Sequence, residues 1–554
     1  MKIRIRAGNF SGSMNQHADV GQPILAWGSS GHGSQPAPGA VYDSSARGKR
    51  PVEKRPRPGL AARRGTLRAC GAFALTLVPF LLLAQQPPDN DKSISRSQVE
   101  RKNKAPVSKE LLKVKLPKPV EAKLDNGLTV MILENHKLPY VSLHLLIEGA
   151  GAIGEPADKA GLAAATAALL TQGTASRTSR QIAEEADLDG TALRANSGFG
   201  GNDANVTASG LSQTFDKWFA LFTDVLLHPS YPDAELKNYR QRTLIGLKQQ
   251  RGQASFLASE RFNRAVYGVF PASVVSASPD FLQAMTSADL QKWHDERYVP
   301  QNAILGITGD VNPQATIAVL KKSLAAWKRT DYEVKLPPSP KAVEQKHVFL
   351  VNRPGSVQTN IVIGNIAIDR RSPDYVAMRV TNQILGGGGA ARLFTKLREE
   401  KGYTYGAYST FTPLAFAGPW RAFSDVRTEV TEGSMSEFFN ELNRLRTEKA
   451  PAGELEEAKR SIVATFALSL ESPSEILQLA ITQKRYGLPV DYWDTYPEKI
   501  EAVTADDVLR TAREYINPEN AQVVAVGDAA KIKTIMEKYG PVTVYDTNGK
   551  EITN

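Results

Sequence analysis

The stretch that decides the fold is TSADL at residues 286–290, which leads to PQNA at 300–303 and to Gly309-Asp310. The same order returns 218 residues later, without a gap, as TADDV at 504–508, PENA at 518–521 and Gly527-Asp528. Each copy predicts a capped helix, a Pro-Asn turn, an apolar strand and a Gly-Asp turn. A repeat of this length indicates that the chain contains two copies of one domain.

The flanking sequence extends this pattern in both directions. Two apolar runs, 120–124 and 128–133, flank the turn Asp125-Asn126-Gly127 and predict a strand pair, and residues 235–267 predict one long helical tract. A Pro-rich polar stretch at 328–346 predicts a linker. We therefore expect an α+β fold of two homologous domains, each a mostly antiparallel sheet packed with helices. The predicted N-terminal domain spans 116–327 and the C-terminal domain spans 347–546.

Charge is distributed unevenly along the 554 residues, whose formal net charge is +10. Residues 1–84 contain 12 Lys and Arg against 3 Asp and Glu, whereas the remainder contains 56 against 55. The basic character therefore belongs to the leader. The body has no basic block with interleaved aromatic residues, so the sequence favours no nucleic-acid partner.

The leader contains an apolar run, 69–84, that includes Cys70, the single cysteine, and follows Arg63, Arg64 and Arg68. This arrangement predicts a signal peptide at 60–84, by the general or the twin-arginine route, and a buried helix is the alternative. Residues 1–59 are expected to be disordered or to be an over-extended start, and 85–115 a polar tether. We expect an exported protein, periplasmic or extracellular, with no membrane span after signal cleavage.

The segment GLAAATAALLTQGT occupies residues 161–174. Its frame, a Gly-Leu start, an apolar helical stretch and a closing Gly-Thr, resembles that of the pitrilysin/insulinase family of zinc peptidases. In that family the frame carries His-x-x-Glu-His. Anchored on Gly173-Thr174, the two metal histidines fall on Ala164 and Ala168, and the general-base glutamate falls on Ala167. Methyl groups neither bind zinc nor accept a proton.

The resemblance also places a third zinc ligand, a glutamate, in the predicted helix 236–259. That stretch contains no Asp or Glu, and Ile245 and Gly246 lie near the expected position. The five histidines beyond the leader include no i,i+4 pair: His136, His144, His228, His294 and His347. We therefore expect no metal in this chain, because catalytic zinc requires three protein ligands.

The second half keeps a different part of the family pattern. Gly386, Gly387, Gly388 and Gly389 precede RLFTKLREEKGYTY at 392–405, which resembles the family's glycine-rich loop and its arginine/tyrosine pair. The pair matches Arg398 and Tyr405, and the resemblance implies that it holds the substrate and the developing oxyanion. We expect the four glycines to bind the substrate, because they let the backbone of an extended peptide approach closely. Without the resemblance, Arg398 pairs with Glu399 or Glu400, Tyr405 is a core residue and the glycines begin a helix.

Two functions are compatible with these residues. In the first, the chain is the non-zinc, substrate-binding subunit of a heterodimeric metallopeptidase, as in processing peptidases. A homologous zinc-bearing subunit would then supply the metal, and unfolded peptides would be the substrate. In the second, the chain is a catalytically inert scaffold or a peptide-binding protein of the same fold. Retention of Arg398, Tyr405 and the glycines favours the first, because a scaffold requires none of them. The sequence leaves open whether the chain forms heterodimers or homodimers.

Overall fold

The computed structural model describes residues 110–553. The predicted start region, signal peptide and most of the tether lie outside the described residues. Within 110–553 no helix combines the length and the apolar run that crossing a bilayer requires.

The first half folds around a six-stranded sheet in the order β1-β2-β6-β3-β5-β4. β2 and β6 are parallel, and the other neighbouring strands are antiparallel. The strands are β1 (Val120–Lys123), β2 (Thr129–Glu134), β3 (Tyr140–Glu148), β4 (Ala192–Ser197), β5 (Asp203–Leu211) and β6 (Ala303–Gly309). The helices are α1 (Leu162–Leu169), α2 (Ser179–Leu188), α3 (Phe215–Leu227), α4 (Asp233–Gln250), α5 (Ala254–Tyr267), α6 (Pro279–Ala284), α7 (Ser287–Arg297) and α8 (Pro313–Ser323).

The second half repeats this plan in a sheet of order β12-β7-β11-β8-β10-β9. Its strands are β7 (His347–Asn352), β8 (Gln358–Ile366), β9 (Thr404–Phe411), β10 (Pro419–Arg427), β11 (Gln522–Gly527) and β12 (Val542–Tyr545). Its helices are α9 (Tyr375–Leu385), α10 (Arg392–Phe394), the π-helical turn η5 (Thr395–Glu400), α11 (Thr431–Thr447), α12 (Ala452–Ser469), α13 (Pro473–Tyr486), α14 (Tyr496–Glu501), α15 (Ala505–Tyr515) and α16 (Ala529–Glu537). Two α+β domains with mostly antiparallel sheets confirm the predicted fold class.

The repeated segment folds in the same way in both halves, except that Pro300–Asn302 forms a 3-10 helix where residues 518–520 form a turn. Thr286 and Thr504 cap α7 and α15, and each forms a reciprocal capping box with an aspartate three residues later. The strands that follow, β6 and β11, are central in their sheets and almost entirely buried. The halves differ at one sheet edge, where β1 runs antiparallel to β2 but β12 runs parallel to β7.

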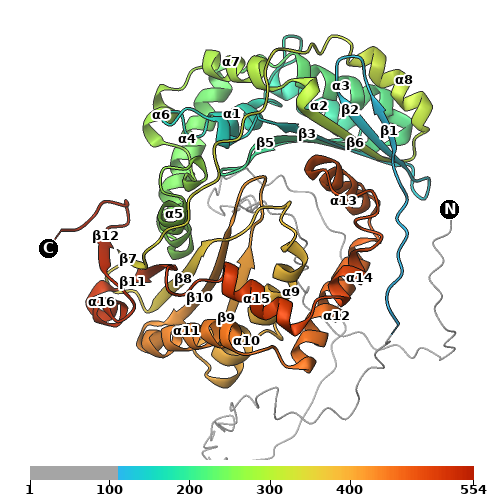
Figure 1. The fold of residues 1–554 in the computed structure, drawn as a ribbon. Coiled ribbons are helices and arrows are strands. Elements are labelled where there is room, and N and C mark those ends of the chain that lie inside the picture. Colours follow the sequence, from blue (N-terminus) through green and yellow to red (C-terminus); the bar gives the residue numbers. More distant parts are fainter. Residues whose placement is uncertain (1–109, 554) are drawn as a thin grey trace, which may run out of the picture. The chain divides into compact units, whose positions relative to one another are not determined.

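Each half has its own core between one sheet face and the helices of that half. In Figure 1, α2, α3 and α8 cover this face of the first sheet. Alternate residues of β2 show the arrangement: Val130 and Ile132 point into this core, whereas Met131 and Leu133 point to the opposite face.

The opposite faces are covered by exchanged helices. From the second half, α13 contributes Ile476, Leu477 and Ile481, which pack on β2 and β6 of the first sheet. From the first half, α5 packs on β8 and β11 of the second sheet. The fit under α13 is tight, because a Cβ at Gly306 would lie 2.7 Å from the Cδ1 of Ile481.

The exchange explains why the predicted helical tract 235–267 was wrong as a single helix. α4 ends at Gln250 and α5 begins at Ala254, with a turn at Arg251–Gln253. Gly252 has low helix propensity. The turn also lets the chain leave the first core and place α5 on the second sheet.

Candidate functional site

The N-terminus of α1, the helix at the metal-motif position, is held in place by Gly161 and Glu155. Gly161 precedes it with φ of 104°, and a Cβ at this glycine would meet the Cβ of Ala277 at 2.6 Å. The Glu155 carboxylate accepts hydrogen bonds from the backbone N–H of Gly161 (3.0 Å) and of Ala163 (2.6 Å). Burial raises the pKa of Glu155 to about 7, although these two hydrogen bonds oppose the shift.

The side chains on α1 do not fit a zinc ion. Ala164 and Ala168 are partly exposed and one turn apart, so they share a face, and Ala167 is buried. On α4, Ile245 is 60% exposed and Gly246 has open space around it. No nitrogen, oxygen or sulfur ligand is offered by these side chains. Among residues 110–553, no group of three or more His, Cys, Asp or Glu side chains has an arrangement that could hold a metal.

The five histidines of the described chain are spread over both halves, and each has a polar partner. His136 contacts Glu134 and Asp310, His144 contacts Gln478 and Asn205, His228 contacts Asp224, His294 contacts the Leu226 carbonyl, and His347 contacts Thr543. Each imidazole therefore has a polar partner within the protein. Among them, His144 links the two halves, because Gln478 lies on α13.

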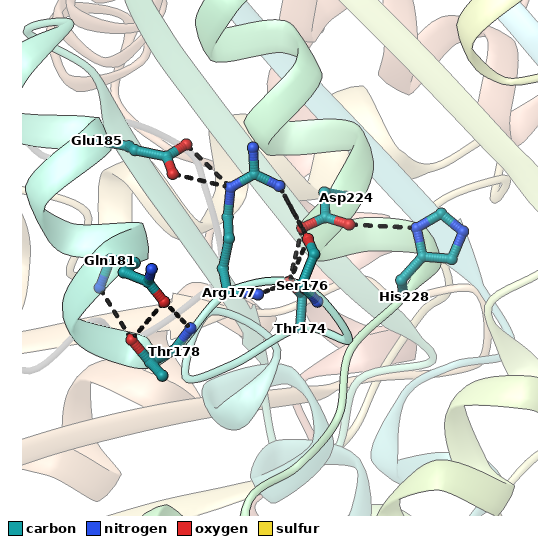
Figure 2. Close-up of polar contacts among 8 residues, drawn as sticks. All are labelled: Thr174, Ser176, Arg177, Thr178, Gln181, Glu185, Asp224 and His228. Carbon is teal, nitrogen blue, oxygen red and sulfur yellow. Dashed lines mark hydrogen bonds and ion pairs between the residues drawn. The ribbon is translucent and has the colours of Figure 1, made fainter.

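A polar network holds the loop that follows α1 (Figure 2). Asp224 on α3 accepts hydrogen bonds from Thr174 Oγ1 (2.6 Å), Ser176 Oγ (3.1 Å) and Arg177 Nη1 (2.8 Å). Arg177 Nε also contacts the Glu185 carboxylate at 2.9 Å. Burial by itself raises the pKa of Asp224, but these hydrogen bonds outweigh it and hold the pKa below its usual value.

The order of groups in this network does not suit nucleophilic catalysis. Ser176 donates to Asp224, and His228 Nδ1 lies 3.3 Å from the other oxygen of the same carboxylate. A nucleophilic serine requires the base itself within hydrogen-bond reach of the hydroxyl. The network therefore fixes the loop against α3.

The four glycines of the second half have two kinds of environment: Gly386 and Gly387 are closely packed, and Gly388 and Gly389 are open. Gly386 accepts a hydrogen bond from the Ser409 N–H (2.9 Å), and a Cβ at this position would overlap that nitrogen. A Cβ at Gly387 would lie 2.5 Å from Gln383 Oε1. Gly388 and Gly389 are open, with nothing nearer than 3.4 Å and 3.9 Å to such an atom. None of the four has a φ in the left-handed region, so close packing accounts for the first pair alone.

Arg398 and Tyr405 lie together at the edge of the second sheet. Arg398, on η5, donates from Nη1 to the Tyr405 carbonyl at 2.8 Å, and its guanidinium lies 5.6 Å from the Tyr405 ring. The ring is on the edge strand β9 and is 88% exposed. Among the described residues Arg398 forms no ion pair with Glu399 or Glu400, and Glu400 pairs with Lys396 at 2.6 Å. Both residues are exposed, and the Tyr405 carbonyl takes one of the five N–H donors of Arg398.

A charged cavity of about 380 Å³ adjoins the open glycines. Arg392, whose side chain is buried, lines it and donates from Nε to Glu454 at 2.9 Å. Lys396 and Arg444, also in the lining, are paired with glutamates. Sequence reasoning did not single out this cavity, because its charges come from helices α10, α11 and α12 and no local motif brings them together.

The duplicated α+β fold has the architecture of a peptidase-like protein, and its motif helix lacks metal-binding side chains. The comparisons agree. A family model described as "Insulinase (Peptidase family M16)" matches residues 129–272, and one described as "Peptidase M16 inactive domain" matches residues 284–462. The two regions together cover more than half of the chain. The chain belongs to the M16 insulinase-like peptidase family.

The matches to relatives and to solved structures cover most of the length of those proteins. An "uncharacterized zinc protease" of Rickettsia bellii is 24% identical over 410 residues, 71% of this chain and 93% of the relative. "Non-peptidase homolog YmxG" of Helicobacter pylori is 21% identical over 394 residues, covering 68% and 87%. A crystal structure of a peptidase M16 inactive domain from Pseudomonas fluorescens superposes with a TM-score of 0.70 at 25% identity, covering 74% of this chain and 98% of that one. The match to an inactive-type domain is consistent with a non-catalytic subunit.

Proposed function

We propose that this chain is the non-zinc, substrate-binding subunit of an exported heterodimeric metallopeptidase that cleaves unfolded peptides. The single observation that carries the proposal is the contrast between its two motif regions. The α1 positions 164, 167 and 168 carry only methyl groups, whereas Arg398 and Tyr405 present unused donors at an exposed sheet edge.

The chemistry of the pair suits negative charge. An arginine guanidinium is permanently charged and offers five N–H donors, of which the Tyr405 carbonyl uses one. The Tyr405 hydroxyl adds a second kind of donor. Such donors stabilise the oxyanion that forms when a peptide bond is attacked. The metal and the general base would come from a homologous zinc-bearing partner, because α1 offers neither.

Export to the periplasm or the extracellular space forms part of the proposal and is supported by the composition of residues 60–84. N-terminal sequencing of the native protein tests it directly. A mature terminus near residue 85 is expected. A cytoplasmic protein that retains residues 60–84 would contradict export and leave the subunit assignment to be judged separately.

The experiment for the subunit assignment begins with purification from the native host, followed by mass spectrometry of the co-purifying chains. We expect a homologous partner with an intact His-x-x-Glu-His motif. Each chain alone should leave an unfolded peptide intact, and the mixture should cleave it. Elemental analysis should find no stoichiometric zinc in this chain alone, and about one zinc per chain would refute the proposal.

The alternative is an inert scaffold of the same fold, which the description of the Helicobacter pylori relative as a non-peptidase homolog favours. A scaffold would co-purify with partners but would leave cleavage unchanged when Arg398 or Tyr405 is altered. The two functions are therefore separated by turnover of the assembled pair.

A further inference from the structure

Aromatic rings and guanidiniums continue from Arg398 across β9 and β10. The ring centroids of Phe394 and Tyr408 are 5.7 Å apart, and those of Tyr408 and Phe423 are 6.2 Å apart. At the far end the Arg421 guanidinium lies 5.6 Å from the Phe423 ring. At the near end the Arg398 guanidinium lies 5.7 Å from the Phe394 ring. We call Phe394, Arg398, Tyr405, Tyr408, Arg421 and Phe423 the aromatic–arginine strip.

Strand register places three strip residues of β9 and β10, Tyr408, Arg421 and Phe423, on one face of the sheet. Tyr408 on β9 is directly opposite Phe423 on β10, and Arg421 lies two residues from Phe423, so the three side chains share a face. The intervening residue Ala422 and its neighbour Trp420 point into the core on the other face. Arg398 and Tyr405 are exposed, and the other four strip residues are partly exposed. Phe423 also packs against the apolar cluster under α5.

The two arginines of the strip have no acidic partner among residues 110–553. Arg398 uses one donor on the Tyr405 carbonyl, and Arg421 donates from Nη1 to Ser259 Oγ on α5 at 3.2 Å. Two residues beyond Phe423, Asp425 accepts a hydrogen bond from Asn360 Nδ2 at 2.7 Å. Guanidiniums held beside rings without a carboxylate are suited to carboxylate ligands, and the rings to aromatic ligands.

The outer backbone edge of β9 is occupied at two residues, Ser409 and Tyr405. The Ser409 N–H donates to the Gly386 carbonyl, and the Ser409 carbonyl accepts from Asn382 Nδ2 at 3.1 Å. Arg398 takes the Tyr405 carbonyl. A ligand therefore cannot extend this edge as a further strand along its length. It would instead lie across the sheet face and be held by side chains.

We propose that the aromatic–arginine strip binds an extended, unfolded peptide segment through its acidic and aromatic side chains. This inference rests on the proposed function and assigns it a substrate class. Arg398 and Arg421 lie at opposite ends of the strip and would bind carboxylates. Phe394, Tyr408 and Phe423 lie between them and would contact aromatic side chains. The open Gly389, beside Phe394, leaves room for the peptide backbone.

The test uses the full chain and two fluorescent twelve-residue peptides that differ only in charge, one alternating Asp with Phe and one alternating Lys with Phe. Fluorescence anisotropy gives the dissociation constants. We expect the acidic peptide to bind at least about tenfold more tightly, and added salt to reduce the difference. Arg421→Gln and Tyr408→Leu should each weaken acidic-peptide binding by about fivefold to tenfold.

The matched control is Arg513→Gln, an exposed arginine on α15 whose loss changes net charge equally. It should keep wild-type affinity. Circular dichroism and thermal unfolding check that each variant folds, and Tyr408→Leu remains informative if Arg421→Gln does not fold. Equal affinities for the two peptides, or wild-type affinity in the folded strip variants, would overturn the inference.

Two further outcomes are decisive. If the strip variants abolish a concentration-dependent dimer in sedimentation, the strip binds a second copy of the chain and the inference is wrong. The proposed function is judged separately by turnover with the partner. Loss of turnover in Arg398→Ala alongside unaffected peptide affinity in the Arg421 and Tyr408 variants would reject only the strip. Selective peptide binding without any cleavage in the assembled pair would reject only the subunit role.

Discussion

The two halves share a sheet order but differ at the helix that packs on the edge strand. In the first half, α1 contacts β4, and the loop after it is fixed by Asp224 and Arg177. In the second half, α9 contacts β9, and four glycines and a π-helical turn follow it. One half has a closed network of paired charges, and the other has open backbone and unpaired guanidiniums. A duplicated scaffold can therefore keep its packing while the chemistry at equivalent positions diverges.

The largest expected effect concerns the open half. Arg398→Ala should reduce turnover of the assembled pair by about 100- to 1000-fold, as expected for loss of one oxyanion donor. Tyr405→Phe should reduce it in the same direction. Folding should be unaffected because both side chains are exposed.

The matched controls for these variants are Arg513→Ala and Tyr140→Phe, which alter exposed residues elsewhere. Steady-state cleavage of an unfolded peptide gives kcat and KM for each pair. Wild-type turnover in both Arg398→Ala and Tyr405→Phe would contradict the subunit role and support the inert scaffold.

Glu155, before α1, and Asp374, before α9, should change the stability of the protein with pH in opposite directions. Glu155 has a folded pKa of about 7, above its ordinary 4.5, so the folded state holds a proton that the unfolded state releases. Its contribution to stability is full below about pH 4.5 and is lost as pH rises to about 7, by about 3 kcal/mol at most. Asp374, before α9, has a lowered pKa because Arg510 hydrogen-bonds to it, so its contribution is lost as pH falls below its ordinary 3.8.

Urea unfolding at pH 5 and pH 8 measures the first effect in the wild type and in Glu155→Gln. The glutamine variant should lose less stability than the wild type between these pH values. Parallel changes in the two proteins would show that Glu155 does not titrate in this range.

The paired network of the first half should matter for stability alone. Asp224→Asn replaces an acceptor of three hydrogen bonds with an amide and should cost about 2 kcal/mol of unfolding free energy. Glu184→Gln is the matched control, because its partner Arg180 is mostly exposed, and should change stability by less than about 0.5 kcal/mol. Equal losses in urea unfolding would contradict the role given to the network.

The smallest effects separate the glycines. Gly386→Ala should lower stability by about 1 kcal/mol or more, because its Cβ would overlap Ser409. Gly389→Ala should leave the thermal midpoint unchanged, because the added methyl group would meet no atom closer than 3.9 Å. It should weaken peptide binding by about threefold, because the methyl group would occupy space left open for the peptide backbone. A large stability loss in Gly389→Ala would show that this glycine also serves packing.

Much of the fold was predictable because its signals are local. The repeat of residues 286–310 at an offset of 218 residues indicated the duplication. Capping aspartates three residues after Thr286 and Thr504 marked the helix starts. The exchange of α5 and α13 was not predictable, because an amphipathic helix does not specify which of two similar sheets it covers. The same limit produced the single predicted tract 235–267.

The candidate site was predictable only where residues are close in sequence. Arg398 and Tyr405 are seven residues apart, and the family resemblance identified them; their roles remain predictions. The glycines were predicted to contact peptide as a group, but Gly386 and Gly387 pack against Ser409 and Gln383. The strip was missed because the pairing of Tyr408 with Phe423 depends on the register between two strands.

The exchanged helices also affect the order in which the protein can be completed during synthesis. Met131, Leu146 and Ile304 form an apolar face of the first sheet, and its cover begins only at Pro473. The ribosome must therefore add more than 160 residues after β6 before that face can be closed. Conversely, the second sheet is made after its cover, α5, already exists. The linker at 328–346 thus joins two sheets that complete each other, and a chain cut there would leave an apolar surface uncovered on both fragments.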